Sequence, residues 1–211
     1  MWCVMNEITA PRFKFGQAAF GAGITAKTLR NWLQRDQIEL FNARSEDDAH
    51  FAFSLGDLAI LAVVAELVRF GMPVRTAFDE IGEIRRHILM LSTFKNAPLG
   101  ALAAALMPIS LFVTNDGSQW EVQTLHNDRE PEPDDGRKFA SVLLVRVPLC
   151  FAEVLDRVQK FQETTDAARR QFGEKEAAEA ERVMAEGRDD TLDRANFPAT
   201  FTTGDKDNIA K

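Results

Sequence analysis

The sequence predicts a mainly helical protein with one small antiparallel β-sheet in its second half. Three observations support this fold class. Apolar residues recur at helical spacing through most of the first 95 residues. Short apolar segments alternate with turn residues between 109 and 147. About three heptads of apolar residues then follow residue 148. With 211 residues, 45% of them hydrophobic, the chain can form one core or two small cores joined by a helix.

Several classes of protein are excluded by composition and motifs. Two cysteines, Cys3 and Cys150, cannot build a disulfide framework, and we expect Cys150 to be a small buried apolar residue. No apolar run is long enough to span a membrane, and the first residues lack the features of a secretory signal. We therefore expect a cytoplasmic protein without membrane contact. Catalytic and metal-binding motifs are missing from the sequence, so we expect no enzyme, cofactor or metal.

Charge is distributed unevenly along the chain. The formal net charge is -7, which argues against nucleic-acid binding by the whole surface. The stretch 12–35 nevertheless contains five cations and no acid: Arg12, Lys14, Lys27, Arg30 and Arg35. The segment after residue 153 is rich in acids. The N-terminal region can therefore form a local anion-binding face.

Two short helices separated by glycines are predicted near the N-terminus. The first covers 16–20, and Gly21-Ala22-Gly23 is suited to a tight turn. Thr25 is a good N-cap for the second helix, with Ile24 and Leu29 as a hydrophobic staple. The spacing places apolar residues on the inner face (Leu29, Trp32, Leu33) and polar residues on the outer face (Lys27, Thr28, Asn31, Gln34, Arg35). This arrangement is a helix-turn-helix candidate.

A small β wing and two further helices are expected next. Segments 38–40 and 51–53 read as short extended segments that flank a polar loop, 42–50. Ser54 and Asp57 form a capping box at the start of a helix that stops at Gly71. Apolar residues from Val74 to Leu91 then predict one continuous helix that ends near 96–98.

The middle of the chain predicts a three-stranded sheet. A short apolar helix, 99–106, precedes a strand at 109–114 and a return strand at 120–125. Asn115-Asp-Gly-Ser118 between them is a strong hairpin turn. After an acidic loop, 126–138, the segment 139–147 is apolar enough to be the central strand.

A long C-terminal helix completes the prediction. Its apolar positions are Phe151, Val154, Val158, Phe161, Thr165, Ala168 and Phe172, and the pattern fails at Lys175. This face suits either a dimer seam or an intramolecular contact that covers the sheet. We therefore divide the chain into a winged helix-turn-helix with its following helix (1–95), a small α+β domain (96–147), a long helix (148–187) and an unstructured tail (188–211).

The N-terminal part resembles the MerR-type winged helix-turn-helix family over about residues 13 to 84. The resemblance is carried by Phe13 to Arg35, by Phe53-Ser-Leu-Gly-Asp-Leu and by Phe70-Gly-Met-Pro-Val. It implies a homodimer on double-stranded DNA, with the helix 25–35 in the major groove and the wing against the backbone. By the same resemblance Thr25 and Thr28 lie near the groove, Arg30 contacts the backbone and Trp32 is structural. The wing departs from the family, because the usual arginine is missing and three acids occupy 46–48.

These observations together predict a DNA-binding transcriptional regulator. Cations contact phosphates, and polar side chains select bases. The candidate DNA-binding residues are Arg12, Lys14, Thr25, Lys27, Thr28, Arg30, Asn31, Arg35 and, as a replacement for the wing arginine, Arg44. An effector or protein partner is expected at the C-terminal domain. The alternative is a protein-interaction or assembly module that keeps the winged-helix fold without binding DNA, which the acidic wing and the net charge favour.

Overall fold

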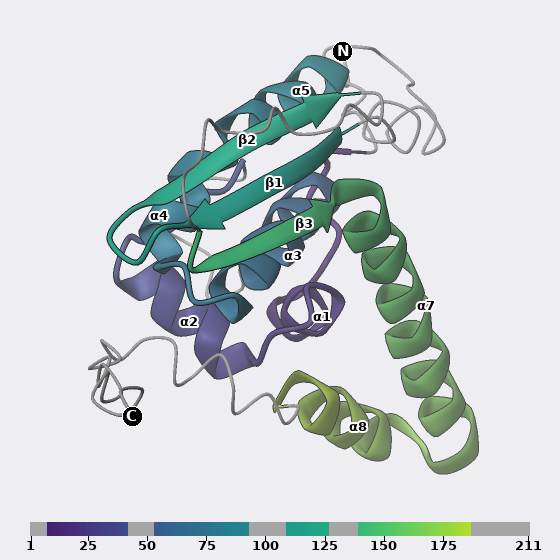
Figure 1. Cartoon of the computed structure of the whole chain (residues 1–211). Coiled ribbons are helices and arrows are strands. Elements are labelled where there is room, and N and C mark those ends of the chain that lie inside the picture. The colour runs from purple at the N-terminus through teal and green to yellow at the C-terminus, as the bar shows by residue number, and fades with distance from the viewer. Residues whose placement is uncertain (1–7, 42–52, 93–108, 127–138, 187–211) are drawn as a thin grey trace, which may run out of the picture.

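The structure, a computed structural model, describes residues 8–41, 53–92, 109–126 and 139–186, and the statements below concern these residues. It is mainly helical and contains one three-stranded antiparallel sheet. Figure 1 shows helices α3 to α5 behind the sheet, with the remaining helices below and to one side. The predicted fold class is confirmed at this level.

The first two helices form as the sequence predicts. Helix α1 spans Phe15–Gly21 and α2 spans Ala26–Gln34. The side chain of Thr25 accepts a hydrogen bond from the backbone N–H of Thr28 at 3.0 Å, so Thr25 is the N-cap. Ile24 and Leu29 are both buried, as the predicted staple requires.

The predicted pairing within the wing is wrong where the structure can be compared with it. Residues 38–40 are not a strand. Phe53 instead forms an antiparallel bridge with Phe13, through N–H···O bonds of 3.0 and 2.9 Å. Ile38 is buried, and the backbone N–H of Phe41 donates to Oδ1 of Asp57 at 2.8 Å. A side-chain hydrogen bond and apolar burial thus fix this segment. The loop 42–50, with Arg44, lies outside the described residues.

Helix α3 (Leu55–Arg69) is the centre of the helical part. The predicted capping box is confirmed, because Asp57 N–H donates to Ser54 Oγ at 3.1 Å and Ser54 N–H donates to Asp57 Oδ2 at 2.8 Å. Residues on almost every side of the helix are buried, as expected for a helix that other elements surround. The chain leaves α3 through Gly71, whose φ of 103° suits glycine.

The expected continuous helix from Val74 is in fact two helices, α4 (Val74–Glu80) and α5 (Gly82–Ser92). The break falls at Ile81, which has a ψ of 16° yet stays fully buried. Gly82 follows the break, and glycine is a poor residue for continuing a helix. Apolar spacing persists across the break, so the sequence pattern did not reveal it. The predicted helix at 99–106 lies outside the described residues.

The sheet consists of β1 (Ile109–Asn115), β2 (Trp120–His126) and β3 (Ser141–Arg146) in the order β2-β1-β3. The predicted hairpin turn is present, with Gly117 at a φ of 97°. The prediction that the third strand is central is wrong, because β1 pairs with both other strands. Every second residue of β1 from Ile109 to Val113 is fully buried, whereas Val142 and Leu144 of β3 are 51% and 48% exposed.

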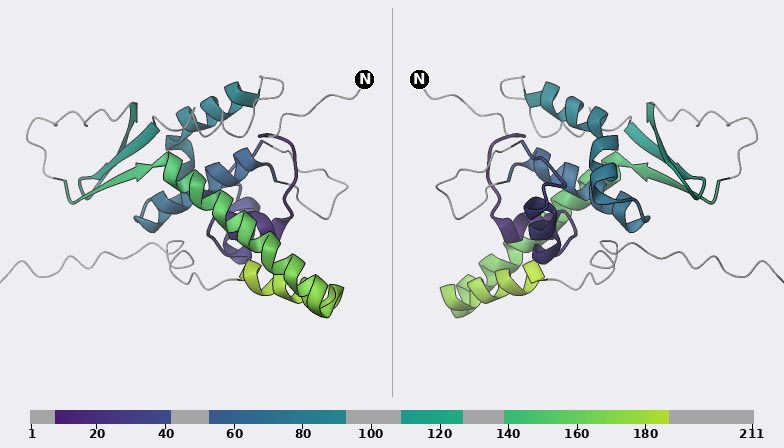
Figure 2. Two further views of the ribbon diagram at one scale, coloured as in Figure 1. Left: turned by 90° about the vertical axis from the view of Figure 1, so that its right-hand side faces the viewer. Right: turned by 90° about the vertical axis from the view of Figure 1, so that its left-hand side faces the viewer.

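The expected single C-terminal helix is a helical hairpin. Helix α7 (Val147–Phe172) starts directly where β3 ends, and α8 (Glu174–Glu186) turns back along it. Gly173, with a φ of 103°, makes the break between them. Figure 2 shows α8 beside the far half of α7, well away from the sheet.

Helix α7 packs within the chain, chiefly on α8, α1 and α3, and it also contacts β1 and β3. Phe151, Val154 and Phe161 are buried there. The helix thus makes an intramolecular contact, but mainly with other helices and not by covering the sheet; the dimer seam stays a prediction. No helix in the described part combines the length and apolar character needed to cross a membrane.

Candidate nucleic-acid interface

Helix α2 has one buried face and one polar face. Leu29 and Trp32 are completely buried, which confirms the predicted structural role of Trp32. Lys27, Arg30 and Arg35 are exposed and Asn31 is half-buried. Residues 27, 30, 31 and 34 lie three or four positions apart, so they share one strip of the helix surface. Gln34 is exposed at the end of that strip and is an addition to the predicted site residues.

Thr28 does not lie on this polar face, contrary to the prediction. It is fully buried, and its hydroxyl is 2.8 Å from the hydroxyl of Thr25. Thr25 is itself 7% exposed. The two threonines form the N-terminal cap of α2, and their hydroxyl groups are hydrogen-bonded to each other. Neither hydroxyl therefore points to a base in this arrangement. The polar groups for base contacts on α2 are then Asn31 and Gln34.

Arg30 connects α2 to the start of α1. Its guanidinium lies over the ring of Phe15 at 5.5 Å from the centroid, and Phe15 contacts Phe53 edge-to-face. Lys14 immediately precedes Phe15 and is exposed, as is Arg12. The structure therefore gathers the predicted cations from two segments, the residues before α1 and the outer face of α2.

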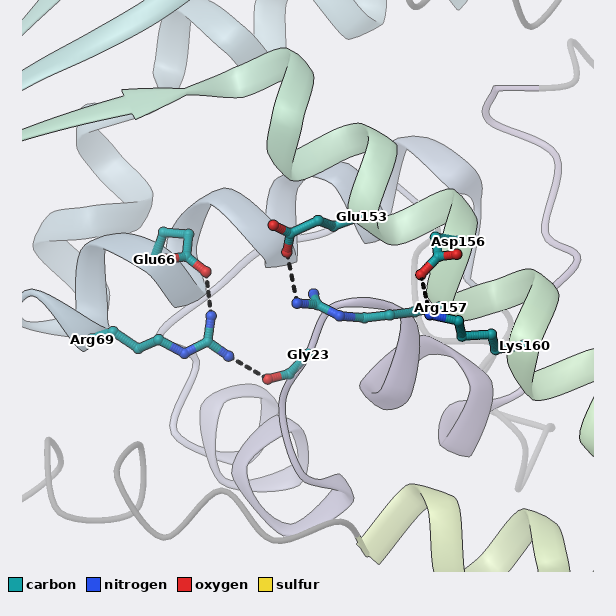
Figure 3. Close-up of polar contacts among 7 residues, drawn as sticks. All are labelled: Gly23, Glu66, Arg69, Glu153, Asp156, Arg157 and Lys160. Atoms are coloured by element: carbon teal, nitrogen blue, oxygen red, sulfur yellow. Dashed lines mark hydrogen bonds and ion pairs between the residues drawn. The ribbon is translucent and has the colours of Figure 1, made fainter.

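The turn between α1 and α2 is held by arginines from two other helices (Figure 3). Arg69 of α3 donates from Nη2 to the carbonyl oxygen of Gly23, and it also pairs with Glu66. Arg157 of α7 pairs with Glu153 at 2.7 Å, and its Nη1 lies 2.5 Å from the place of a Cβ on Gly23. Gly23 has a φ of 71°. Neither arginine was predicted from the sequence, because only the tertiary fold brings them to the turn.

The far end of α2 has a similar contact. Arg75 of α4 donates from Nη1 to the carbonyl oxygen of Asp36 at 3.3 Å and pairs with Asp79 at 3.1 Å. Asp36 follows α2 and has a φ of 49°, in the left-handed region where aspartate is tolerated. Backbone carbonyls on both sides of α2 thus accept hydrogen bonds from arginines on neighbouring helices.

Helix α8 lies beside the predicted interface and is acidic. It contacts α1 and the adjoining part of α2, and Ala185 lies 3.0 Å from the place of a Cβ on Gly16. It carries five glutamates against two cations: Glu174, Glu176, Glu179, Glu181, Glu186, Lys175 and Arg182. Arg182 pairs with Glu179 and Glu186, so part of this charge is compensated within the helix. The surface around α2 therefore carries both positive and negative charges.

In the described part of the chain, the other reactive side chains give no second site. Burial, together with the charges of Glu66 and Glu153, raises the pKa of the half-buried Cys150 to about 12, in keeping with its expected apolar character. His126 contacts Glu83 at 2.9 Å. Burial raises the pKa of Glu83, but hydrogen bonds from His126 and Thr124 outweigh it and the net pKa is lowered. No group of three metal-binding side chains is found among the residues that the structure describes.

Comparison with known proteins adds no relative. No family model matches the chain, and no curated protein matches it in sequence.

Proposed function

We propose that this protein is a DNA-binding transcriptional regulator of the winged helix-turn-helix type, similar in its N-terminal part to MerR proteins. In this proposal α2 enters the major groove as the recognition helix. The observation that carries the proposal is the division of α2 into a buried face, with Leu29 and Trp32, and an exposed cationic face, with Lys27, Arg30 and Arg35.

The chemistry of that face suits duplex DNA. Cations on α2 and before α1 supply phosphate contacts, whose affinity arises from counterion release. Asn31 and Gln34 carry amides that can donate to and accept from an adenine edge. The stretch from residue 12 to residue 35 contains no acid, so no carboxylate within it repels phosphate.

The proposed regulator acts as a homodimer. A single small helix-turn-helix unit buries too little surface for tight and selective binding, whereas two copies read two half-sites. The sheet and the helix α7 that continues from it are the proposed region for an effector or protein partner.

A second candidate function is a protein-interaction or assembly module on the same fold. The observation that favours it is the acidic helix α8 beside α1 and α2, in a chain whose formal net charge is -7. Such a module uses the polar face of α2 for a protein partner and shows no preference for duplex DNA.

Selection of bound fragments from random duplex DNA separates the two candidates. We expect enriched fragments with a two-fold symmetric sequence, and an affinity that falls steeply with added salt. Lys27→Ala and Arg35→Ala each reduce the dependence of log Kd on log salt by about 1, and Asn31→Ala changes which sequences are enriched. Lys160→Ala, which removes an exposed cation of α7, is the matched control and leaves DNA binding unchanged. No enrichment and no binding at low salt would refute the regulator.

A further inference from the structure

We propose that Arg69, Arg75 and Arg157 are positioning residues of the DNA interface, which set the orientation of α2 without contacting DNA. This inference rests on the proposed function, because it concerns how the same helix is presented. The three arginines come from three different helices, α3, α4 and α7, and all three act on the chain immediately before or after α2.

Two arginines contact the turn at the start of α2. Gly23 lies two residues before the N-cap Thr25. Its carbonyl oxygen accepts a hydrogen bond from Arg69, and the guanidinium of Arg157 occupies the space where a Cβ would lie. The turn is therefore confined between α3 and α7, and any movement of it displaces the first turn of α2.

The third arginine contacts the chain at the end of α2. Asp36 follows the C-cap residue Arg35, and its carbonyl oxygen accepts a hydrogen bond from Arg75 at 3.3 Å. Leu29 and Trp32 pack α2 against the core, and the contacts at the two ends of this nine-residue helix further restrict its direction.

All three arginines form ion pairs within their own helices. Each pairs with a carboxylate one turn away on its own helix: Arg69 with Glu66, Arg75 with Asp79 and Arg157 with Glu153. These pairs orient the guanidinium groups toward α2 and compensate their charge. Arg69 and Arg75 also donate to backbone carbonyls beside α2, so a role in positioning is favoured over direct contact with DNA.

Lys160 provides a matched control on α7. It pairs with Asp156 at 2.7 Å with the same four-residue spacing as Arg157 and Glu153, and Figure 3 shows it pointing away from Gly23. Removing it eliminates one cation and one ion pair of the same kind, but no contact with the turn.

The test measures DNA binding and hydrogen exchange of the full chain. A fluorescent duplex carrying the selected sequence is titrated with wild type and with Arg69→Ala, Arg75→Ala, Arg157→Ala and Lys160→Ala, at several salt concentrations. We expect each of the three arginine variants to bind about three- to tenfold more weakly, with an unchanged salt dependence. In the free protein, amide exchange in α2 accelerates in these variants while exchange in α3 does not. Lys160→Ala matches wild type in every measurement, and Arg69→Lys restores part of the affinity.

Two results overturn the inference. One is an affinity that stays at the wild-type value in all three arginine variants. The other is a salt dependence that falls by about 1 for each arginine removed, because this identifies the arginines as phosphate contacts. If wild type itself binds no duplex, the proposed function fails first, and this outcome is distinct because it appears before any variant is compared.

Discussion

At the scale of single residues, Gly23 is the position in the predicted interface where a side chain is least tolerated. Its φ of 71° lies in the region that L-residues avoid, and Arg157 already occupies the place of a Cβ. We expect Gly23→Ala to lower the free energy of unfolding by about 1–2 kcal/mol from backbone strain alone, with a further loss from displacing Arg157. Urea unfolding followed by circular dichroism measures the change.

Gly82→Ala is the matched control for this prediction. A Cβ at Gly82 meets no atom within 4 Å, and the residue begins a helix. Alanine is the better helix former, so this variant is expected to be as stable as wild type or slightly more stable. Equal unfolding free energies for Gly23→Ala and Gly82→Ala would show that the turn tolerates a side chain and is not confined.

The comparison of Thr25 with Thr28 shows what the sequence reveals about individual residues. The cap at Thr25 was predictable, because capping depends on residues only three positions apart. The prediction that Thr28 points outward was wrong. Periodicity gives the angle of a side chain around the helix axis, but it does not show how wide a strip of the helix the rest of the chain covers. Arg69 and Arg157 were missed because their contact with Gly23 spans sequence separations that no local pattern encodes.

At the scale of elements, the two faces of the sheet explain which apolar residues stabilise it. Leu111 and its partner Val145 lie on the buried face, whereas Leu144 pairs with Phe112 on the opposite face. Leu111 of β1 is fully buried between Thr124 and Val145, its partners on the two neighbouring strands, whereas Leu144 of β3 is 48% exposed. We expect Leu111→Ala to lower the free energy of unfolding by about 2–5 kcal/mol and Leu144→Ala by less than about 1 kcal/mol. Urea unfolding of both variants measures the difference.

The opposite ranking would indicate that the face of the sheet with Leu144, and not the face with Leu111, is the buried one. The sequence correctly predicted the three strands and the hairpin, because alternation and the Asn115–Gly117 turn are local signals. The strand order depends on which side of the hairpin β3 pairs with. The apolar composition of β3 is equally compatible with a central strand and with an edge strand. The helix breaks at Ile81 and Gly173 were missed for a related reason, since apolar spacing continues past the first break and fades only gradually around the second.

At the scale of the whole molecule, one continuous core joins regions that the sequence divides into separate domains. Buried residues of α1 to α5, the sheet and α7 form a single cluster. Trp120 at the start of β2 packs edge-to-face on Phe70 at the end of α3, and Phe151 and Val154 of α7 are buried in the same cluster. We therefore expect the sheet and the helices around α2 to behave as one cooperative unit.

A single cooperative unit implies that the two regions unfold together. Trp32 is buried in α2, and Trp120 reports on the sheet, so they sample both sides of the predicted boundary at residue 95. In protein labelled with 5-fluorotryptophan, we expect the native ¹⁹F resonances of Trp32 and Trp120 to disappear with the same urea midpoint, because neither region retains its buried surface without the other. Substituting each tryptophan by phenylalanine in turn assigns the resonances. If the resonance of Trp120 disappeared at a distinctly lower urea concentration than that of Trp32, the sheet would unfold independently.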